Sequence, residues 1–271
     1  MRHERTLLRR EPGCGMTRAM TSTLLCLLLA AGVAAPAPAA LPAPPTPAPA
    51  VAPTTTLDEL VARASAVQEQ KPQRLTCKVV IRASLLDSDG NPKEVQDLER
   101  TESWQAGKSK RGPITRSAMD GKPLTPAELQ EANAADAKKQ ADFDARQQRG
   151  EGQELGPVFS KARVAQTVFK LLREEPLAGR RAFLLEFAPK PGVKDGRAGT
   201  AWVDAETFVA LQVHSSPKPL PDHVDKLNME EEQIASAQGE VVPKRMYIDG
   251  AGGFFFLKRR FRLETSWSDC K

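Results

Sequence analysis

The sequence has few of the side chains that carry out chemistry in enzymes. Its 271 residues include three histidines and four cysteines, and only 5% of them are aromatic. Hydrolytic and metal-dependent reactions usually need a histidine, yet only His214 and His223 lie beyond the first 40 residues, and no cysteine stands near them at zinc-site spacing. We interpret both as solvated loop residues, and we expect no catalytic residue, no metal and no cofactor.

Two short motifs resemble catalytic elements but lack their context. GAGG at 250–253 precedes a strand-like run and not the helix that a phosphate-binding loop requires, so we predict a hairpin turn there. In GTAWVDAETF, Asp204 and Glu206 stand two positions apart within DAET, whose residue types favour turns. Exposed carboxylates in a turn remain ionised and do no acid–base work. We therefore predict a turn here and not a catalytic acid pair.

The sequence also lacks an apolar run of about 20 residues, the length that a membrane-spanning helix needs. The run TSTLLCLLLAAGVAA at 21–35 is shorter in its apolar core, follows Arg18 and ends in small residues, as in a secretory signal peptide. We expect residues 1–40 to be this signal, cleaved after Ala35 or Ala40. Residues 41–55 then form a linker rich in proline and alanine, a composition that favours extended polyproline conformation.

A strong charge of one sign is missing once the signal is set aside. The net charge is +5, but residues 1–40 hold five of the 39 basic residues and two of the 34 acidic ones, which leaves 34 against 32. No basic field broad enough to steer nucleic acid is implied. We therefore expect no nucleic-acid partner.

Two cysteines, Cys77 and Cys270, remain beyond the signal, one near each end of the folded region. An even pair in an exported chain indicates a disulfide, which would close a long loop and stabilise the fold. Two free buried thiols are the alternative.

What the sequence does contain is a series of strand-like runs separated by turn formers. Runs 74–86 and 93–105 flank DSDGNP, which predicts a β-hairpin. The later runs are QTVFKLLREEPLAGRRAFLLEFAPKPG, AGTAWV with TFVALQVHS, EEQIASA with VVPKRMYI, and the last strand GGFFFLKRRFRLETSW. Because short turns join antiparallel strands and parallel strands need long crossovers, we predict an antiparallel meander.

Two segments are helical in pattern. Thr56 and Glu59 form the capping-box pattern before an apolar stripe, so a helix there should pack on the sheet. A second box opens residues 125–150, whose only large apolar anchors are Leu129 and Phe143. We predict a largely exposed helical insertion at about 118–150 that covers an edge or the mouth of the sheet.

The last strand leaves two interpretations open. One of its faces collects Phe255, Leu257, Phe261 and Leu263, while basic residues dominate the other. This apolar face either packs into a filled core or lines a cavity wide enough for acyl chains.

The chain is similar to a known superfamily in the order of its parts and in three stretches, GRRAFLLEFAPKPG, GTAWVDAETF and ETSWSD. It resembles the outer-membrane lipoprotein-sorting proteins of the LolA, LolB and RseB kind. The resemblance spans residues 56–271. It implies an α+β fold in which a curved antiparallel sheet, an unclosed β-barrel, carries helices across its concave side.

The resemblance also implies a function without catalysis. We expect a monomeric carrier in the periplasm of a Gram-negative bacterium, tethered to the membrane only if the signal is not cleaved. Its partner would be a lipid or an acylated lipoprotein. The alternative is an envelope protein-binding or sensor module with a filled core. Candidate lipid-binding residues are Trp104, Trp202, Phe208, Phe255 and Leu257, and Arg82 and Arg100 are candidates for a gating arginine.

Overall fold

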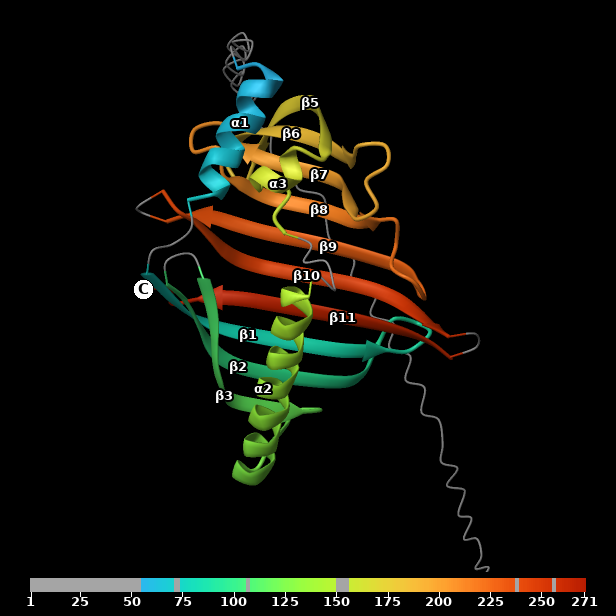
Figure 1. Ribbon diagram of the computed structural model, residues 1–271. Coiled ribbons are helices and arrows are strands. Elements are labelled where there is room, and N and C mark those ends of the chain that lie inside the picture. Colours follow the sequence, from blue (N-terminus) through green and yellow to red (C-terminus); the bar gives the residue numbers. More distant parts are fainter. Residues whose placement is uncertain (1–54, 71–73, 106–107, 150–155, 237–238, 255–256) are drawn as a thin grey trace, which may run out of the picture. The chain divides into compact units, whose positions relative to one another are not determined.

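The computed structural model describes residues 55–70, 74–105, 108–149, 156–236, 239–254 and 257–271 (Figure 1). The expected signal peptide, and all of the linker except Thr55, lie outside the described residues. The chain divides into Met1–Val51 and Ala52–Lys271, and the second unit is described by itself. Among the described residues, no helix combines the length and the apolar character that a membrane crossing requires.

The described strands form one antiparallel sheet, which is not closed into a barrel. Its order is β4-β3-β2-β1-β11-β10-β9-β8-β7-β6-β5, so the strands follow the chain except where β1 lies beside β11. The strands are β1 Arg74–Leu86, β2 Pro92–Gln105, β3 Lys108–Met119, β4 Lys122–Pro123, β5 Thr167–Leu177, β6 Arg180–Pro189, β7 Gly196–Asp204, β8 Ala210–Lys218, β9 Val224–Ala235, β10 Val241–Phe254 and β11 Leu257–Ser268. The predicted antiparallel meander is confirmed, whereas β3 and β4 had no counterpart in the sequence analysis.

The strand register assigns each side chain to one face of the sheet, because cross-strand partners project to the same side. One row of cross-strand partners runs across the sheet from β6 to β2. It includes Leu185, which packs in one core with the helix residues Leu60 and Ala64, so the row lies on the face that the helix covers. Its members are Leu185, Ala201, Val213, Glu231, Met246, Thr265, Ile81 and Leu98. We call this side, which carries the helices in Figure 1, the concave face and the opposite side the convex face.

The three described helices are α1 Leu57–Gln68, α2 Pro126–Gln148 and α3 Lys161–Val164. At the start of α1, the backbone N–H of Glu59 donates to Thr56 Oγ1 at 3.3 Å, as the capping motif predicts. The Glu59 carboxylate, however, pairs with Arg63 at 2.5 Å, so only one half of the capping box forms. The α+β class and the helices over the concave side are as the resemblance implied.

The position of α2 follows from the topology. β4 lies at one edge of the sheet and β5 at the other, so the chain between them must cross the whole concave face. Strands spaced at about 4.8 Å make this crossing nearly 50 Å wide, and 23 helical residues span about 35 Å of it. A helix suits this crossing because it satisfies its own backbone hydrogen bonds. The predicted limit at residue 118 was too early, since β3 continues to Met119.

The predicted hairpin turn at GAGG is wrong. Residues 250–253 belong to β10, and Phe254 pairs with Leu257, which places the connection at 255–256, outside the described residues. Gly250 and Gly252 are needed because neighbouring residues lie too close to the β10 backbone to leave room for a side chain. A Cβ on Gly250 would overlap the ring of Phe261, and one on Gly252 would overlap the carbonyl oxygen of His223.

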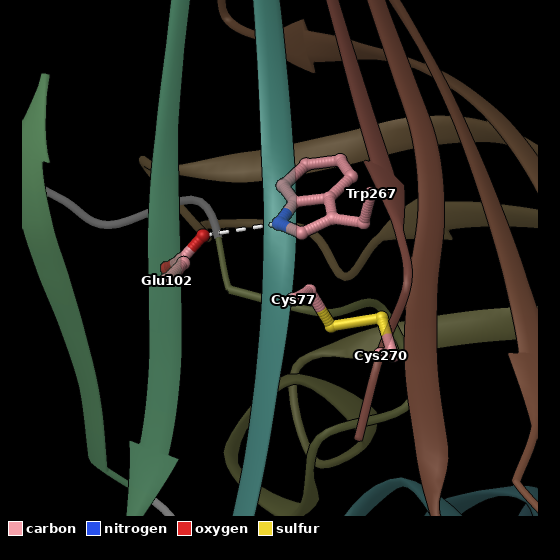
Figure 2. Close-up of a disulfide and its surroundings, with 4 residues drawn as sticks. All are labelled: Cys77, Glu102, Trp267 and Cys270. Carbon is pink, nitrogen blue, oxygen red and sulfur yellow. Dashed lines mark hydrogen bonds between the residues drawn. A yellow bond between two sulfur atoms is a disulfide. The ribbon is translucent and has the colours of Figure 1, made fainter. Parts of the chain in front are cut away.

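The predicted disulfide between Cys77 and Cys270 is present (Figure 2). It joins β1 to the residues just after β11, at the one pairing in the sheet that brings the two ends of the folded region together. Because 193 positions separate the two cysteines, the cross-link removes much loop entropy from the unfolded chain, worth about 5 kcal/mol in the entropic model.

Candidate binding face

The concave face consists of two parts that differ in what covers them. The closed half is the concave face of β5–β8, on which α1 and α3 pack. The open half is the concave face of β9–β11 and β1–β3, which α2 crosses (Figure 1).

The closed half is a sealed apolar core. Leu60 of α1 is 1% exposed, Phe159 before α3 is 1% exposed, and Leu185 of β6 is 0% exposed. Phe159 also stacks on Phe169 of β5, with ring centroids 5.3 Å apart. The hollow beside Val158 and Phe187 measures about 10 Å³, which is no more than one water molecule needs. This hollow is too small for an acyl chain.

The open half presents a continuous apolar surface that is only half buried. By the register, its side chains are neighbours on β9, β10, β11, β1 and β2. We call these residues the apolar patch: Leu227, Met246, Ile248, Phe261, Leu263, Ile81, Ala83, Leu85 and Leu98, all of intermediate exposure. The last strand therefore does collect apolar side chains on one face, as predicted.

Polar contacts hold α2 in place over the open half. Asn133 donates from Nδ2 to the carbonyl of Ile114 at 3.1 Å and accepts from the Ile114 N–H at 2.7 Å. Its side chain thereby pairs with a β3 residue much as a neighbouring strand would. Asp136, nearly one turn further on, accepts from Arg100 Nη1 of β2 at 2.9 Å.

The apolar anchors predicted for α2 contribute less than expected. Phe143 is 39% exposed, so it does not anchor the helix. Leu129 is half buried, and it shares the inner side of α2 with Ala132, Asn133, Asp136 and Gln140, which recur at helical spacing. The inner side of α2 is therefore largely polar or small.

The two gating candidates lie in different surroundings. Arg100 is 7% exposed, lies on the concave face and forms the ion pair with α2. Arg82 lies on the convex face, mostly exposed, with its Nε 3.7 Å from Asp97 of the next strand. The structure thus brings only Arg100 into contact with the covering helix.

A buried ion pair marks the boundary between the halves. Arg197 of β7 is 6% exposed and donates to Ser215 Oγ at 2.5 Å and to the carbonyl of Gly156 at 3.3 Å. Its Nη2 also contacts the Glu231 carboxylate on β9. Sequence reasoning missed this site, although an arginine among the small residues of GRAGTAWV was the available signal.

A tryptophan cluster surrounds the disulfide at one end of the open half. Trp104 and Trp267 pack against Leu75 and Cys77. The Trp267 indole N–H donates to Glu102 Oε2 at 3.0 Å (Figure 2), and the same carboxylate accepts from Ser109. Of the predicted lipid-binding residues, Trp104 is thus the one placed with the concave face of β1 and β2.

Two of the other predicted lipid-binding residues, Trp202 and Phe208, do not join Trp104. Trp202 lies on the convex face, where its indole donates to Glu175 at 2.7 Å. Phe208 lies in the turn after β7 and packs against the closed half, with the Arg63 guanidinium 4.8 Å from its ring centroid. Phe255 is outside the described residues. Leu257 begins β11 opposite Phe254.

Asp204 shapes the turn between β7 and β8, as predicted, but it is buried and not exposed. It accepts from Thr207 N at 2.7 Å, Thr207 Oγ1 at 2.8 Å and Arg180 Nε at 2.7 Å. Burial raises the pKa of this carboxyl, but the hydrogen bonds from Thr207 and Glu206 and the charge of Arg180 outweigh it, so the pKa lies below its usual value. Asp204 is therefore a structural anion.

Of the two histidines predicted to be loop residues, His223 is exposed in a turn, as predicted, whereas His214 is not in a loop. His214 lies within β8 on the convex face, edge-on to Trp202 with centroids 5.0 Å apart, and His223 lies in the turn before β9. In the described part of the chain, no group of three or more His, Cys, Asp or Glu side chains is placed to hold a metal ion.

The geometry defines a class of fold, an open antiparallel sheet whose concave face is sealed on one half and crossed on the other half by a helix that polar contacts hold in place. No family model and no curated protein matches the chain. Solved structures that match include a LolA superfamily protein from Nitrosomonas europaea, at 13% identity over 80% of this chain and 93% of that one, with a TM-score of 0.35.

Two further matches have similar coverage. A DUF1329 family protein from Desulfovibrio piger is 11% identical over 79% of this chain and 90% of that one, with a TM-score of 0.34. The Pseudomonas aeruginosa MucA/MucB complex matches at 9% identity over 78% of this chain and 94% of that one, with a TM-score of 0.25. All three TM-scores lie below 0.5, so the fold description rests on the strand order of this chain.

Proposed function

We propose that the open half binds acyl chains of a lipid or lipoprotein, without catalysis, and that α2 covers the bound chain. One observation carries this proposal. The apolar patch is continuous across five strands, yet its side chains remain half exposed beneath a helix whose inner side is polar or small. An apolar ligand would complete the burial that α2 leaves unfinished.

The energetics favour such a ligand. Each methylene moved from water onto an apolar surface contributes about 0.8 kcal/mol, so a chain of several methylenes along the patch supplies enough free energy for binding. The patch is rich in Leu, Ile and Met, and aliphatic side chains of this kind suit a flexible chain. The low aromatic content of the sequence does not weaken this argument.

The contacts of α2 suit a cover that opens. Asn133 and Asp136 hold the helix by hydrogen bonds, and water can replace a partly exposed hydrogen bond at a net loss of about 1 kcal/mol each. Lifting α2 would leave the sealed core of the closed half in place, because α1 and α3 cover that core. Arg100 is the gating residue that we propose, acting through Asp136.

The proposed location is the periplasm of a Gram-negative bacterium. The disulfide between Cys77 and Cys270 supports export, since such bonds persist in oxidising compartments. The signal-like segment at 21–35 supports the same route.

A protein partner is the second candidate, favoured by the ring of Phe143 on α2, which is 39% exposed. In that case α2 would dock an envelope protein, and the open half would serve only as support for the helix.

The two functions are separated by titrating the full chain with a fluorescent fatty acid. Ile81 and Val80 are adjacent in β1 but project to opposite faces, so Ile81→Gln and Val80→Gln form a matched pair. We expect Ile81→Gln to weaken probe binding about tenfold, because it places an amide in the apolar patch, and Val80→Gln to leave it unchanged.

Equal affinities in the two variants would contradict binding at the open half. A folded wild-type protein that binds no probe would favour the protein-docking alternative instead.

A further inference from the structure

A basic hollow lies at one end of the sheet, where the β1–β2 turn faces the first residues of β11. It measures about 600 Å³, within the usual range of ligand sites. Its lining residues are Leu85, Leu86, Asp87, Ser88, Lys93, Glu94, Lys258, Arg259 and Arg260.

The hollow has four basic side chains and two acidic ones, and one of the acidic side chains, Asp87, already accepts hydrogen bonds within the turn. Asp87 Oδ1 accepts from the backbone N–H groups of Asp89 at 2.9 Å and Asn91 at 2.8 Å, so it serves to form the turn. Arg260 donates to the carbonyl of Ser88 at 3.1 Å, which fixes its guanidinium at the rim.

Two of the cations are available to a ligand. Among the residues that the structure describes, no ion-pair partner is found for Lys93 or Arg259, and both side chains are exposed. Lys258 pairs with Asp225 at 3.0 Å, but that pair is itself exposed. The hollow therefore presents unneutralised positive charge next to a fixed guanidinium.

The hollow and the apolar patch share one residue, Leu85. This residue lines the hollow and also shares the concave face with Phe261, its cross-strand partner on β11. An extended ligand on the patch would therefore reach the basic hollow with one end.

We propose that the ligand of the open half is an anionic amphiphile, whose acyl chain lies on the apolar patch and whose phosphate head group enters the basic hollow. This inference rests on the proposed function and adds the charge of the head group. Arginine suits such a group because its planar fork matches two phosphate oxygens, and lysine adds a point charge.

The test compares three probes on the full chain by calorimetry at low salt: palmitoyl lysophosphatidylglycerol, the neutral monopalmitoylglycerol, and glycerol 3-phosphate without an acyl chain. We expect the anionic lipid to bind about fivefold more tightly than the neutral one, as suits two exposed charge contacts. The preference should decline as salt screens the charges.

The variant Lys93→Gln/Arg259→Gln should lose this preference and bind both lipids alike. A matched control, Lys170→Gln/Lys218→Gln, removes the same charge from exposed positions on β5 and β8 and should keep the preference. A preference that survives in Lys93→Gln/Arg259→Gln would overturn the proposal.

Two further outcomes also overturn it, and they are distinct from failure of the proposed function. Equal binding of both lipids by the wild type would remove the head-group site while leaving acyl binding intact. Glycerol 3-phosphate that binds as tightly as the lysolipid would show a site for free phosphate with no tie to the patch. If neither lipid binds, the proposed function fails as well.

Discussion

The closed and open halves of the concave face belong to one sheet, yet only the first is sealed. The difference lies in the helices. The inner side of α1 supplies Leu60 and Ala64, which pack in one core with residues of β6–β8, whereas α2 supplies Asn133 and Asp136. An apolar stripe closes a sheet face permanently, while a polar stripe holds a helix over it and leaves the surface beneath accessible.

The two buried arginines allow the largest test of this comparison. Arg197→Ala would leave the Glu231 carboxylate on the concave face without its ion-pair partner. Because a largely buried charge without a partner is costly, we expect the unfolding free energy to fall by about 3–5 kcal/mol. Arg100→Ala should cost only about 1–2 kcal/mol, because Asp136 can regain water. Urea denaturation of both variants measures the difference, and equal losses would mean that α2 is as firmly integrated as the closed half.

The helices themselves provide the next test. Leu60→Ala removes a fully buried side chain from α1 and is expected to cost about 3 kcal/mol. Leu129→Ala, its counterpart on the inner side of α2, should cost about 1 kcal/mol because the side chain is only half buried. Thermal and chemical unfolding of the two variants measures both losses. A Leu129→Ala variant less stable than Leu60→Ala would contradict the view that α1 is packed more tightly than α2.

Acidification should lower the free energy of unfolding by a smaller amount, through protonation of the Asp204 carboxylate in the turn between β7 and β8. The folded-state pKa of this carboxyl lies below the unfolded value of about 3.9, so its contribution to stability is present above that pH and is lost as the pH falls toward the folded pKa. We expect Asp204→Asn to cost about 1–2 kcal/mol at pH 7. The gap between wild type and variant should narrow below about pH 4.

A gap that stays constant from pH 7 to pH 3 would show that the Asp204 charge does not matter to the turn. Asp195→Asn serves as a control, because Asp195 is an exposed acidic residue in the neighbouring connection.

Local signals made much of the fold predictable. The DSDGNP turn and the runs beside it predicted β1 and β2, and the second capping box predicted the start of α2, where Glu128 accepts from Thr125 N at 2.8 Å. β3 escaped prediction because KSKRGPITRSAM is too polar for an apolar alternation to stand out. Its backbone is instead held by β2 on one side and by Asn133 on the other.

The candidate site was less predictable, because it depends on which face a side chain occupies. Trp104 and Trp202 looked alike as lining residues, yet the register places them on opposite faces. Single-residue shifts at bulges, such as the one between Trp202 and Val203, make such assignments hard to read along one strand. Arg100 could be named only by position until its contact with α2 was known.

The sequence by itself determined most of the strands, with β3 and β4 as exceptions, and the two main helices, because turn residues and helix caps act over short range. It also offered Cys77 and Cys270 as a disulfide candidate, since both lie beyond the signal-like segment. Tertiary structure alone decided that β1 lies beside β11, that the chain between β4 and β5 crosses the concave face with α2 over its open half, and that the apolar patch lies beneath the polar side of α2. These features depend on contacts between residues far apart in the chain, which no local pattern encodes.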